Sequence, residues 1–263
     1  MKKKNLFTAP LLILLFLCPL LLLTACSFGG SSAGPQTPEP EEVVYHGKIM
    51  QNTGESLLLA GAGENADSAE LYRLGLKELS VYGLDGGAAE PGDLTAGALV
   101  DVVYDGSIME SFPAQFSRPV KISVTALEDD LTGLYLQIID DLYRIDPGLN
   151  DGISLVAFDL SAVENLSPSE KSALLYLTGN AYGLETRAAT YKELVEEGLI
   201  DEENLYFEKG LLFTFDDMEF SDQSFTFDVK KWRSGLGAYY FVDCTAEKGE
   251  AGWDYSVGQE AIS

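Results

Sequence analysis

The spacing of apolar residues changes along the chain near residue 128. From residue 43 to residue 127, apolar and polar residues alternate in short segments, which is the pattern of β-strands with one buried face. In ALVDVVY, for example, Val100, Val102 and Tyr104 fall on one face and the residues between them on the other. Turn residues separate these segments, so the pattern predicts about five short strands and favours a small β-barrel. The strand segments, of which the third and fourth are weaker, are 43–50, 55–60, 69–74, 79–82, 98–104 and 119–124.

Helical spacing begins after residue 128. The apolar stripe of a helix of about four turns consists of Leu131, Leu134, Tyr135, Ile138 and Leu142. Residues 167–170, Ser-Pro-Ser-Glu, form a capping box with proline at the first helical position, and they predict a second helix that ends at Gly183. A shorter third helix is expected from Thr190 to Gly198.

One buried strand is expected at 153–160, between the first two helices. Strand patterns then return after residue 209, and further strands are expected at 210–215, 224–229, 235–246 and 253–257. Helices that precede a run of antiparallel strands are typical of the α+β class. The expected fold class is therefore α+β, with a small five-stranded OB-like β-barrel followed by an α+β domain of helices packed on a curved antiparallel sheet.

The first 25 residues have the parts of a secretory signal. Three lysines at positions 2–4 precede an apolar run from residue 11 to residue 23. This run is shorter than the roughly 20 residues that a membrane span needs. It ends in LTAC, residues 23–26, which resembles the lipobox of bacterial lipoproteins and implies cleavage before Cys26 and diacylation of the Cys26 thiol. An uncleaved N-terminal anchor is the alternative.

The chain is strongly acidic. Three of its 17 basic residues lie in the signal segment, which leaves 14 against 42 acidic residues and a formal net charge of −28 for the mature chain. Nucleic acids and anionic phospholipids require a basic surface, so we expect neither as a partner. A solvated acidic surface explains the charge, and cation capture is the alternative.

One cysteine remains in the part of the chain that is expected to fold. Cys18 lies in the signal segment and Cys26 carries the expected lipid, which leaves Cys244. Strand alternation places Cys244 on the face of Tyr240 and Val242, and we expect its thiol to be buried and unreactive. The single histidine, His46, lies in the other expected domain. A disulfide framework, a zinc cluster and a Ser-His-Asp triad are therefore not expected.

Residues 101–119 gather aromatic and acidic residues around a turn. Asp105 and Gly106 predict a hairpin turn, and Pro113 marks an edge, a bulge or a corner. Residues 105–115 resemble the signature D-G-x-I-x-E-S-[YF]-P-A-Q of barrel modules in secreted and lipid-anchored proteins of Gram-positive bacteria, which implies a barrel and no assigned activity. We interpret this segment as a corner, with a ligand site as the alternative.

A second short motif, GAGENA at residues 61–66, loosely fits a dinucleotide-binding fingerprint. That fingerprint opens a helix inside a βαβ unit. Strand patterns flank the motif on both sides here, so the sequence predicts a hairpin loop.

A further resemblance covers most of the C-terminal half. Residues 183–185, 231–235 and 261–263 fit a pattern of extracytoplasmic modules from Clostridia-like bacteria, and helices on a bent sheet are similar to cystatin-like or nuclear-transport-factor-like domains. This resemblance implies an architecture and no particular activity. The expected organisation is a lipoprotein signal peptide (1–25), the lipidated Cys26 with a flexible Gly/Ser/Pro linker (26–42), a small β-barrel domain (43–127) and an α+β cystatin-like domain (128–263).

No motif in the sequence specifies a reaction. Neighbouring carboxylates occur at 129–130, 140–141 and 216–217, but a chain with 42 acids contains such pairs by chance. The sequence DPGLNDG, residues 146–152, departs from a calcium-binding EF-hand loop at its third and sixth positions. We expect a lipid-anchored, extracytoplasmic binding or scaffolding protein of the bacterial cell envelope, with no enzyme activity, cofactor or metal. The alternatives are an envelope hydrolase that uses paired carboxylates and a calcium-dependent module.

Trp232 and Arg233 are the candidate binding residues. Both residue types are enriched at interaction hot spots, and both lie next to two glycines that allow a sheet to bend. The expected partners are the membrane, through the lipid on Cys26, and an envelope protein or cell-wall ligand. Alternatively, Trp232 fills the open end of the sheet and Arg233 pairs with a nearby acid.

Overall fold

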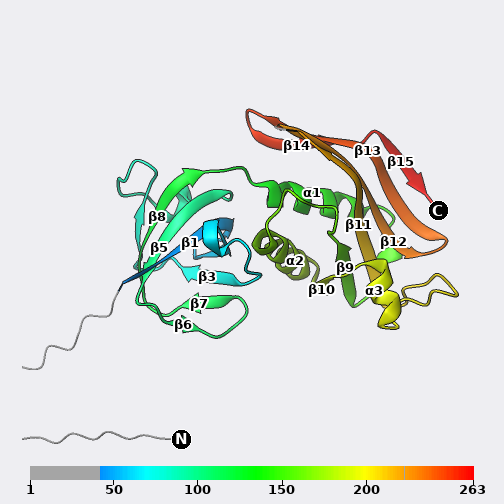
Figure 1. Ribbon diagram of the computed structural model, residues 1–263, viewed down its shortest axis with the longest axis horizontal. Coiled ribbons are helices and arrows are strands. Elements are labelled where there is room, and N and C mark those ends of the chain that lie inside the picture. Colours follow the sequence, from blue (N-terminus) through cyan, green and yellow to red (C-terminus); the bar gives the residue numbers. More distant parts are fainter. Residues whose placement is uncertain (1–41, 222) are drawn as a thin grey trace, which may run out of the picture. The chain divides into compact units, whose positions relative to one another are not determined.

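The computed structural model describes residues 42–221 and 223–263. In this part of the chain, two separate β-sheets are accompanied by few helices (Figure 1). The protein therefore has a mixed, sheet-rich α+β fold, as the sequence predicts. None of the helices in the described ranges is long and apolar enough to cross a membrane.

The first sheet is a curled half-barrel with the strand order β4-β8-β5-β1-β2-β3-β7-β6. Its strands are β1 (Val43–Asn52), β2 (Ser56–Gly61), β3 (Leu71–Gly75), β4 (Ser80–Tyr82), β5 (Ala98–Tyr104), β6 (Ile108–Met109), β7 (Ala114–Phe116) and β8 (Pro119–Leu127). The sheet has eight strands and not the expected five. Strands β6 and β7 contain only two and three residues, so neither is long enough to produce a recognisable alternation.

Alternate side chains of the half-barrel form its core. The buried positions include Leu57, Leu59, Val100, Val102 and Ile122. The predicted phase of β5 is therefore confirmed. Val120, which the alternation in β8 places inward, is 48% exposed because it lies at the start of the strand. Shifts in register within β1 and between β5 and β8 favour the bending of this sheet.

The second sheet has the strand order β10-β9-β11-β12-β13-β14, and β15 pairs with β13. Its strands are β9 (Leu155–Asp159), β10 (Glu185–Ala188), β11 (Gly210–Phe220), β12 (Ser224–Ser234), β13 (Gly237–Gly249), β14 (Gly252–Ser256) and β15 (Gln259–Ile262). The expectation of an antiparallel sheet is wrong for its first three strands, because β9 pairs in parallel with β10 and β11. A helix crosses over between β9 and β10 and brings the chain back in the same direction.

The three predicted helices are confirmed. They are α1 (Leu131–Arg144), α2 (Pro168–Tyr182) and α3 (Tyr191–Glu196). Helix α2 begins with the expected capping box of Ser167 and Glu170, and it ends at Gly183, which has a φ of +66°. Helix α3 begins with the same motif at Thr190.

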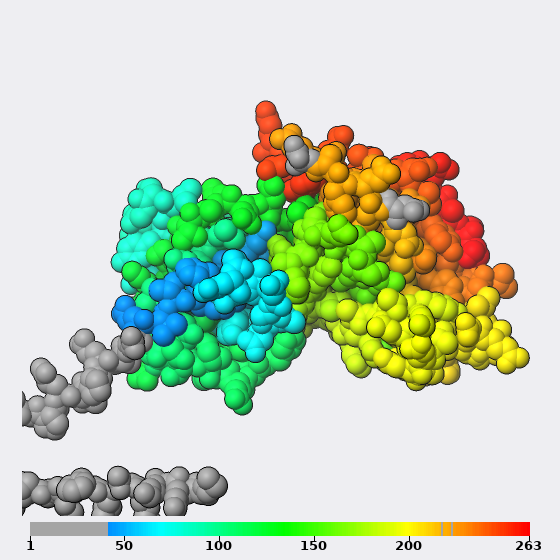
Figure 2. Space-filling model, in the orientation of Figure 1, coloured from blue at the N-terminus to red at the C-terminus, as the bar shows by residue number. Residues whose placement is uncertain are grey.

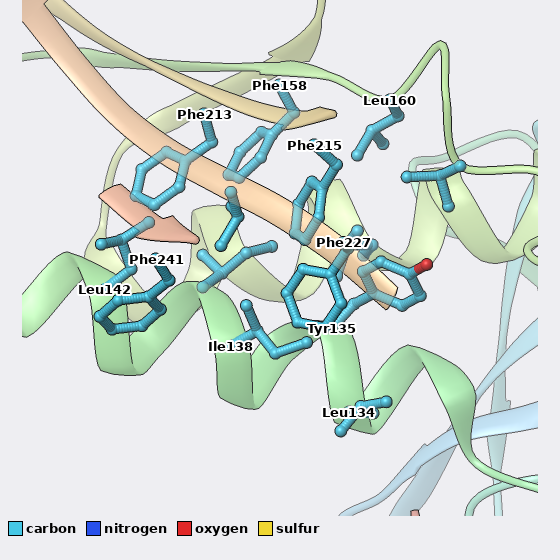
Figure 3. Packing of buried hydrophobic residues seen from close by; sticks show 14 of the residues in the cluster. Leu134, Tyr135, Ile138, Leu142, Phe158, Leu160, Phe213, Phe215, Phe227 and Phe241 are labelled. Atoms are coloured by element: carbon cyan, nitrogen blue, oxygen red, sulfur yellow. The ribbon is translucent and has the colours of Figure 1, made fainter. Parts of the chain in front are cut away.

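Aromatic side chains dominate the core between α1 and the second sheet (Figure 3). The helix contributes Leu134, Tyr135, Ile138 and Leu142, and the strands contribute Phe158, Phe213, Phe215, Phe227 and Phe241. Each of these side chains is at least 97% buried. Burial of one such side chain stabilises a fold by roughly 1.5 to 3 kcal/mol, so this layer holds the helix on one face of the sheet.

Candidate functional site

Strand β12 presents successive side chains to opposite faces of the second sheet. Phe225, Phe227 and Val229 point toward the helix-covered core. Lys231 continues this phase and is fully buried, whereas Lys230 and Trp232 lie on the other face and are partly exposed. Trp232, one of the two candidate residues, therefore lies on the face of the sheet away from α1.

A polar row crosses four strands on that face. Asp159 of β9 is opposite Thr214 of β11, Thr214 is opposite Lys230 of β12, and Lys230 is opposite Tyr240 of β13. The neighbouring row contains Trp232, opposite Leu212. Side chains at facing positions of adjacent strands lie roughly 5 Å apart, so these residues share one continuous surface.

These two rows form the floor of a cleft of about 420 Å³. The cleft is lined by Asp159, Tyr191, Leu205, Leu212, Thr214, Asp216, Lys230, Trp232 and Tyr240. Tyr191, from α3, packs against Trp232 with an edge-to-face geometry and ring centroids 5.4 Å apart. Three aromatic residues, from one helix and two strands, therefore surround a small number of polar groups, which is typical of a ligand-binding site. We call this surface the aromatic cleft.

Several polar atoms in the aromatic cleft are free to bind a ligand. Lys230 Nζ donates a hydrogen bond to Asp216 Oδ2 at 3.2 Å, so these two charges neutralise each other. Asp159 uses Oδ1 to accept hydrogen bonds from Ser161. The Thr214 and Tyr240 hydroxyl groups make no side-chain hydrogen bond with any residue in the described ranges. The cleft thus combines one carboxylate, which has no cationic partner among the described residues, with hydroxyl groups that can donate or accept.

One rim of the aromatic cleft contains a strained residue. Leu205 has a φ of +50°, which is unfavourable for a residue with a branched side chain, and it is 47% exposed. Its carbonyl oxygen accepts a hydrogen bond of 2.8 Å from the amide of Gly235, in the turn between β12 and β13. Leu236, at the tip of the same turn, is 92% exposed. Backbone strain and exposed apolar side chains therefore occur together at this rim, which is more typical of binding surfaces than of packed cores.

Arg233 has a structural role. Its guanidinium donates hydrogen bonds to the carbonyl oxygens of Leu149 (2.8 Å), Asp151 (2.7 Å) and Glu208 (3.1 Å). It therefore binds backbone carbonyls and not the acidic side chain that the alternative interpretation expected. Of the two candidate residues, only Trp232 lines the aromatic cleft.

Lys231, which was not among the predicted site residues, has a similar role at the end of α1. Its Nζ donates to the carbonyl oxygens of Tyr143 (3.2 Å), Ile145 and Asp146 (3.3 Å), and to Asn150 Oδ1 (3.3 Å). Burial lowers the pKa of Lys231 to about 8, although the negative charge of Asp146 acts in the opposite direction. Together, Lys231 and Arg233 bind three carbonyl oxygens of the 146–152 loop, those of Asp146, Leu149 and Asp151.

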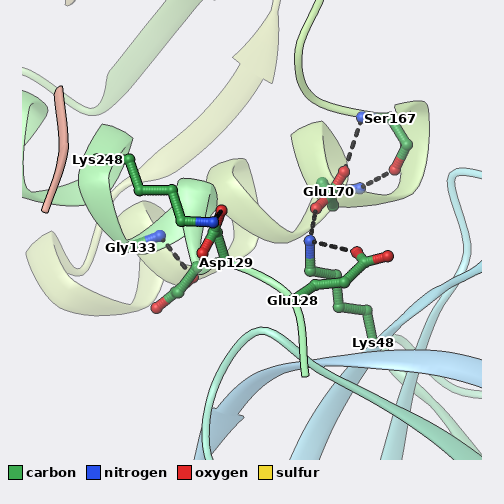
Figure 4. A network of polar contacts seen from close by, with 8 residues as sticks. Lys48, Glu128, Asp129, Gly133, Ser167, Glu170 and Lys248 are labelled. Atoms are coloured by element: carbon green, nitrogen blue, oxygen red, sulfur yellow. Dashed lines mark hydrogen bonds and ion pairs between the residues drawn. The ribbon is translucent and has the colours of Figure 1, made fainter. Parts of the chain in front are cut away.

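A second buried lysine lies at the N-terminus of α2 (Figure 4). Lys48 Nζ, from β1, donates to Glu170 Oε1 at 2.8 Å and lies 3.3 Å from Glu128 Oε2. Burial lowers the pKa of Lys48, but the two carboxylates outweigh it, so this pKa lies above its usual value. Burial raises the pKa of Glu170, but Lys48 and the backbone amide of Ser167 outweigh it, so this pKa lies below its usual value. This ion pair joins the half-barrel to α2.

The GAGENA segment is a hairpin loop, as predicted. It follows β2, which pairs with β3 in antiparallel fashion, and it contains one turn of 3₁₀-helix at 63–65. The loop contacts α2: the Gly61 amide donates to Ser169 Oγ at 2.6 Å, and the Ser169 amide donates to the Ala66 carbonyl at 3.2 Å. Figure 2 shows this loop, in cyan, against the yellow-green surface of α2. A side chain at Gly61 would collide with the carbonyl oxygen of Asn65, so this glycine permits the tight loop that contacts α2.

The segment from residue 105 to residue 115 forms a corner, in agreement with our interpretation. Asp105 accepts a hydrogen bond from the Ser107 amide at 3.0 Å, and Gly106 has a φ of +80°. The prediction of a hairpin turn at Asp105-Gly106 is wrong, because β6 pairs with β7 and not with β5. Phe112 is 68% exposed, and its ring packs edge-to-face on Tyr176 of α2. The corner is therefore a further contact between the half-barrel and α2.

Cys244 is fully buried, as predicted, but on the opposite face from the one predicted. Asp243 has a φ of +53°, and the register between β12 and β13 shifts by one residue beside it. This bulge places Cys244 in the core together with Phe241, and not on the face of Tyr240. Burial raises the pKa of the thiol to about 12, so the thiolate is not populated near neutral pH.

The paired carboxylates have separate structural partners. Asp129 binds Lys248 at 2.7 Å, and Asp130 caps α1 through the Gly133 amide at 2.8 Å. Asp140 binds Arg144, and Asp141 accepts a hydrogen bond from Tyr255. The side chain of Asp217 lies outside the described part. Among the residues that the structure describes, no three His, Cys, Asp or Glu side chains gather as a metal site would require.

Comparisons with known proteins add little. No family model matches the chain, and no curated protein matches it. One solved structure to which it is similar is the aspartyl tRNA synthetase from Entamoeba histolytica, with 8% sequence identity and a TM-score of 0.25. The alignment covers 73% of this chain and 47% of that chain, which is about half its length. A similarity at this level carries no argument about fold or function.

The expected lipidation site, Cys26, lies outside the described residues.

Proposed function

We propose that this chain is a lipid-anchored, extracytoplasmic binding or scaffolding protein of a bacterial cell envelope, without catalytic activity. The basic, apolar and small residues of positions 1–25 and the lipobox-like LTAC support this location. We also propose that it belongs with lipoproteins of Gram-positive bacteria. The expected diacylglyceryl group would provide two acyl chains, which is what stable membrane anchoring requires.

The aromatic cleft is the observation that supports a binding role. Trp232, Tyr191 and Tyr240 provide apolar contact area. The Thr214 hydroxyl group and the second carboxylate oxygen of Asp159 provide polar atoms that make no hydrogen bond within the described part of the fold. Polar side chains that serve only stability normally have hydrogen-bond partners within the fold. A ligand site, in contrast, contains polar groups without such partners. The cleft therefore supports recognition of a small molecule or of a chain segment.

The alternatives have less support. The carboxylates of Asp129, Asp130, Asp140 and Asp141 bind cations, amides or hydroxyl groups of the fold, which does not favour an acid–base pair for hydrolysis. The carbonyl oxygens of the 146–152 loop accept hydrogen bonds from Lys231 and Arg233, which does not favour a calcium ion there.

Two finer assignments of the fold belong to the same proposal. We infer that the half-barrel is related to the OB-like barrels and that residues 128–263 form a cystatin-like or nuclear-transport-factor-like domain. Strand curvature supports the first assignment, and the packing of α1 on a bent sheet supports the second. An experimental structure compared with representatives of these folds would test both assignments.

The anchor can be tested by metabolic labelling with a fatty-acid probe. Wild-type protein should incorporate the probe, and Cys26→Ala should lose the label and accumulate as a precursor of higher mass. Cys244→Ala is the matched control and should label normally, because its thiol is buried. Equal labelling of the Cys26→Ala variant would contradict lipidation at this position.

The binding role can be tested by co-sedimentation of the full-length protein, in detergent, with isolated cell walls and with immobilised envelope proteins. Tyr240→Ala should reduce retention on one of these materials at least about fivefold, since it removes a cleft side chain that contributes hot-spot contacts. Tyr82→Ala, in β4 of the half-barrel, is the control and should be retained like the wild type. Equal retention of both variants would contradict a binding role for the cleft.

A further inference from the structure

The aromatic cleft has features that indicate the chemical class of its ligand. We propose that it binds a neutral oligosaccharide, with a pyranose ring against Trp232 and ring hydroxyl groups along the row of Asp159, Thr214 and Tyr240. This inference rests on the proposed binding function and specifies its ligand. Three properties of the cleft carry it: its aromatic surface, its mixture of hydrogen-bonding groups and its charge.

The aromatic surface fits a sugar ring. Trp232 and Tyr240 lie on the same face of neighbouring strands, two residues along the register from each other, so both border the same strip of sheet. Aromatic faces carry partial negative charge, and the axial C–H groups of a pyranose carry partial positive charge. A sugar ring can therefore cover an aromatic side chain while its hydroxyl groups point outward to polar partners.

The polar row fits hydroxyl groups. The free groups of the cleft include a carboxylate oxygen, which only accepts, and hydroxyl groups, which both donate and accept. Thr214 is only 6% exposed, yet its hydroxyl group has no side-chain partner in the described part of the chain. A ligand whose own groups both donate and accept can satisfy this mixture, as vicinal sugar hydroxyls do. A purely apolar ligand would leave the row unsatisfied.

The charge of the cleft disfavours two other ligand classes. Among the residues that the structure describes, Lys230 is the one cation that lines the cleft. Asp216 already neutralises it, so a phosphate or other anion would meet the carboxylate of Asp159 without a free cation. A lysine-rich peptide would find one available carboxylate for several positive charges. A neutral ligand avoids both mismatches, and the juxtaposition of like charges weakens binding.

The size of the cleft is compatible with this ligand. Its volume of about 420 Å³ lies within the range of roughly 300 to 1,000 Å³ that is usual for small-molecule sites. The exposed Leu205 side chain extends the apolar surface of the cleft beyond its floor. The cleft can therefore hold one or two sugar units of a chain that continues over the rim.

The test is a fluorescence titration of the full-length protein in detergent with N-acetylchitotetraose and with cellotetraose. The sequence contains two tryptophans, so the Trp253→Phe variant leaves Trp232 as the only indole reporter. We expect a saturable change in Trp232 emission with at least one of the two neutral sugars. Tetralysine and inorganic phosphate are the charged comparison probes and should produce no saturable change.

Two nearly isosteric variants locate the binding. Thr214→Val and Tyr240→Phe each remove one hydroxyl group and should weaken sugar binding about tenfold, as expected for the loss of one hydrogen bond in a desolvated site. Thr226→Val, on the exposed face of β12, and Tyr82→Phe are the matched controls and should leave the affinity unchanged. Circular dichroism melts should be the same for all four variants within a few degrees.

The outcomes separate this inference from the proposed function. Sugar binding that Thr214→Val and Tyr240→Phe do not weaken would overturn the assignment of the ligand to this cleft. If neither sugar binds but tetralysine binds in a Tyr240-dependent manner, the sugar inference is wrong and the binding function stands. If no probe binds and Tyr240→Ala also leaves envelope co-sedimentation unchanged, both the inference and the proposed role of the cleft are wrong.

Discussion

Lys48 and Lys231 are both buried, but the protein holds them in different ways. Lys48 is 8% exposed and forms an ion pair with Glu170, which comes from a distant part of the chain. Lys231 is fully buried and binds only uncharged oxygen atoms at the end of α1. The pKa of Lys48 is raised, and the pKa of Lys231 is lowered to about 8.

The difference shows what each lysine contributes. A carboxylate partner compensates the loss of hydration with a full opposite charge, whereas carbonyl dipoles compensate it only in part. The carbonyl groups at the end of α1 also carry the partial negative charge of the helix dipole, which attracts the ammonium group. Lys48 therefore links the half-barrel to α2, and Lys231 satisfies the C-terminus of α1.

The largest effect is expected for Lys48→Met. It leaves Glu170 buried without a counter-charge, so the free energy of unfolding should fall by about 3 to 5 kcal/mol in urea denaturation. The double variant Lys48→Met/Glu170→Gln should recover most of this loss, because glutamine keeps the capping box of α2. Lys121→Met, at an exposed position of β8, is the control. A single variant as stable as the control would refute the importance of this ion pair.

A smaller effect is expected for Lys231→Met. The variant removes the donor from several carbonyl oxygens but also removes a buried charge, so we expect a loss of about 1 to 3 kcal/mol by the same measurement. The adjacent Lys230→Met is a matched control on the exposed face, and it should cost no more than about 1 kcal/mol. Similar costs for both variants would mean that the contacts of Lys231 with α1 contribute little.

The pH dependence of stability should distinguish the two lysines. The folded-state pKa of Lys231, about 8, lies below the value of 10.5 for a free lysine, so the unfolded chain binds more protons between these values. Its contribution to the free energy of unfolding should therefore rise with pH from 8 to 10, by at most about 1.4 kcal/mol per unit. The difference between wild type and Lys231→Met isolates this rise. A flat difference would show that the carbonyl oxygens compensate the burial fully.

The contribution of the Lys48–Glu170 pair to stability should instead be constant near neutral pH. The raised pKa of Lys48 makes its contribution complete below pH 10.5 and lost as the pH rises through the folded-state pKa. The lowered pKa of Glu170 makes its contribution complete above pH 4.5 and lost as the pH falls through its folded-state pKa. The difference between wild type and the double variant should therefore be constant from pH 5 to 9. A slope within that range would contradict these shifts.

The smallest effect on the free energy of unfolding is expected for Glu170→Gln in the separated fragment 128–263. We expect residues 43–127 and 128–263 each to form a soluble domain, since each is long enough for its own core. In fragment 128–263 Lys48 is absent, so Glu170→Gln should change stability by less than about 0.5 kcal/mol, whereas Lys231→Met should cost as much as in the full chain. If neither fragment folds, the two sheets depend on each other and the boundary near Glu128 is wrong.

Local patterns were sufficient to predict most elements of the fold. The stripe of α1, the capping boxes of α2 and α3 and the main strands of both sheets were all identified from spacing. These features depend on residues a few positions apart, and local spacing is what a sequence displays directly. The phase of β12 also contained an unused signal, because Phe225, Phe227 and Val229 alternate inward and Lys231 takes the next inward position.

The sequence by itself thus determined the order and type of the longer elements, but not the short strands β6, β7, β10 and β15. It also predicted the burial of Cys244, and it selected Trp232 as a candidate site residue. Only the tertiary structure decided the parallel pairing of β9, the face that Cys244 occupies and the row that joins Asp159, Thr214 and Tyr240. Pairing depends on which strands meet after long connections, and one bulge at Asp243 reverses every later side chain. A site made of residues from four strands and a helix follows from that register, which no local pattern specifies.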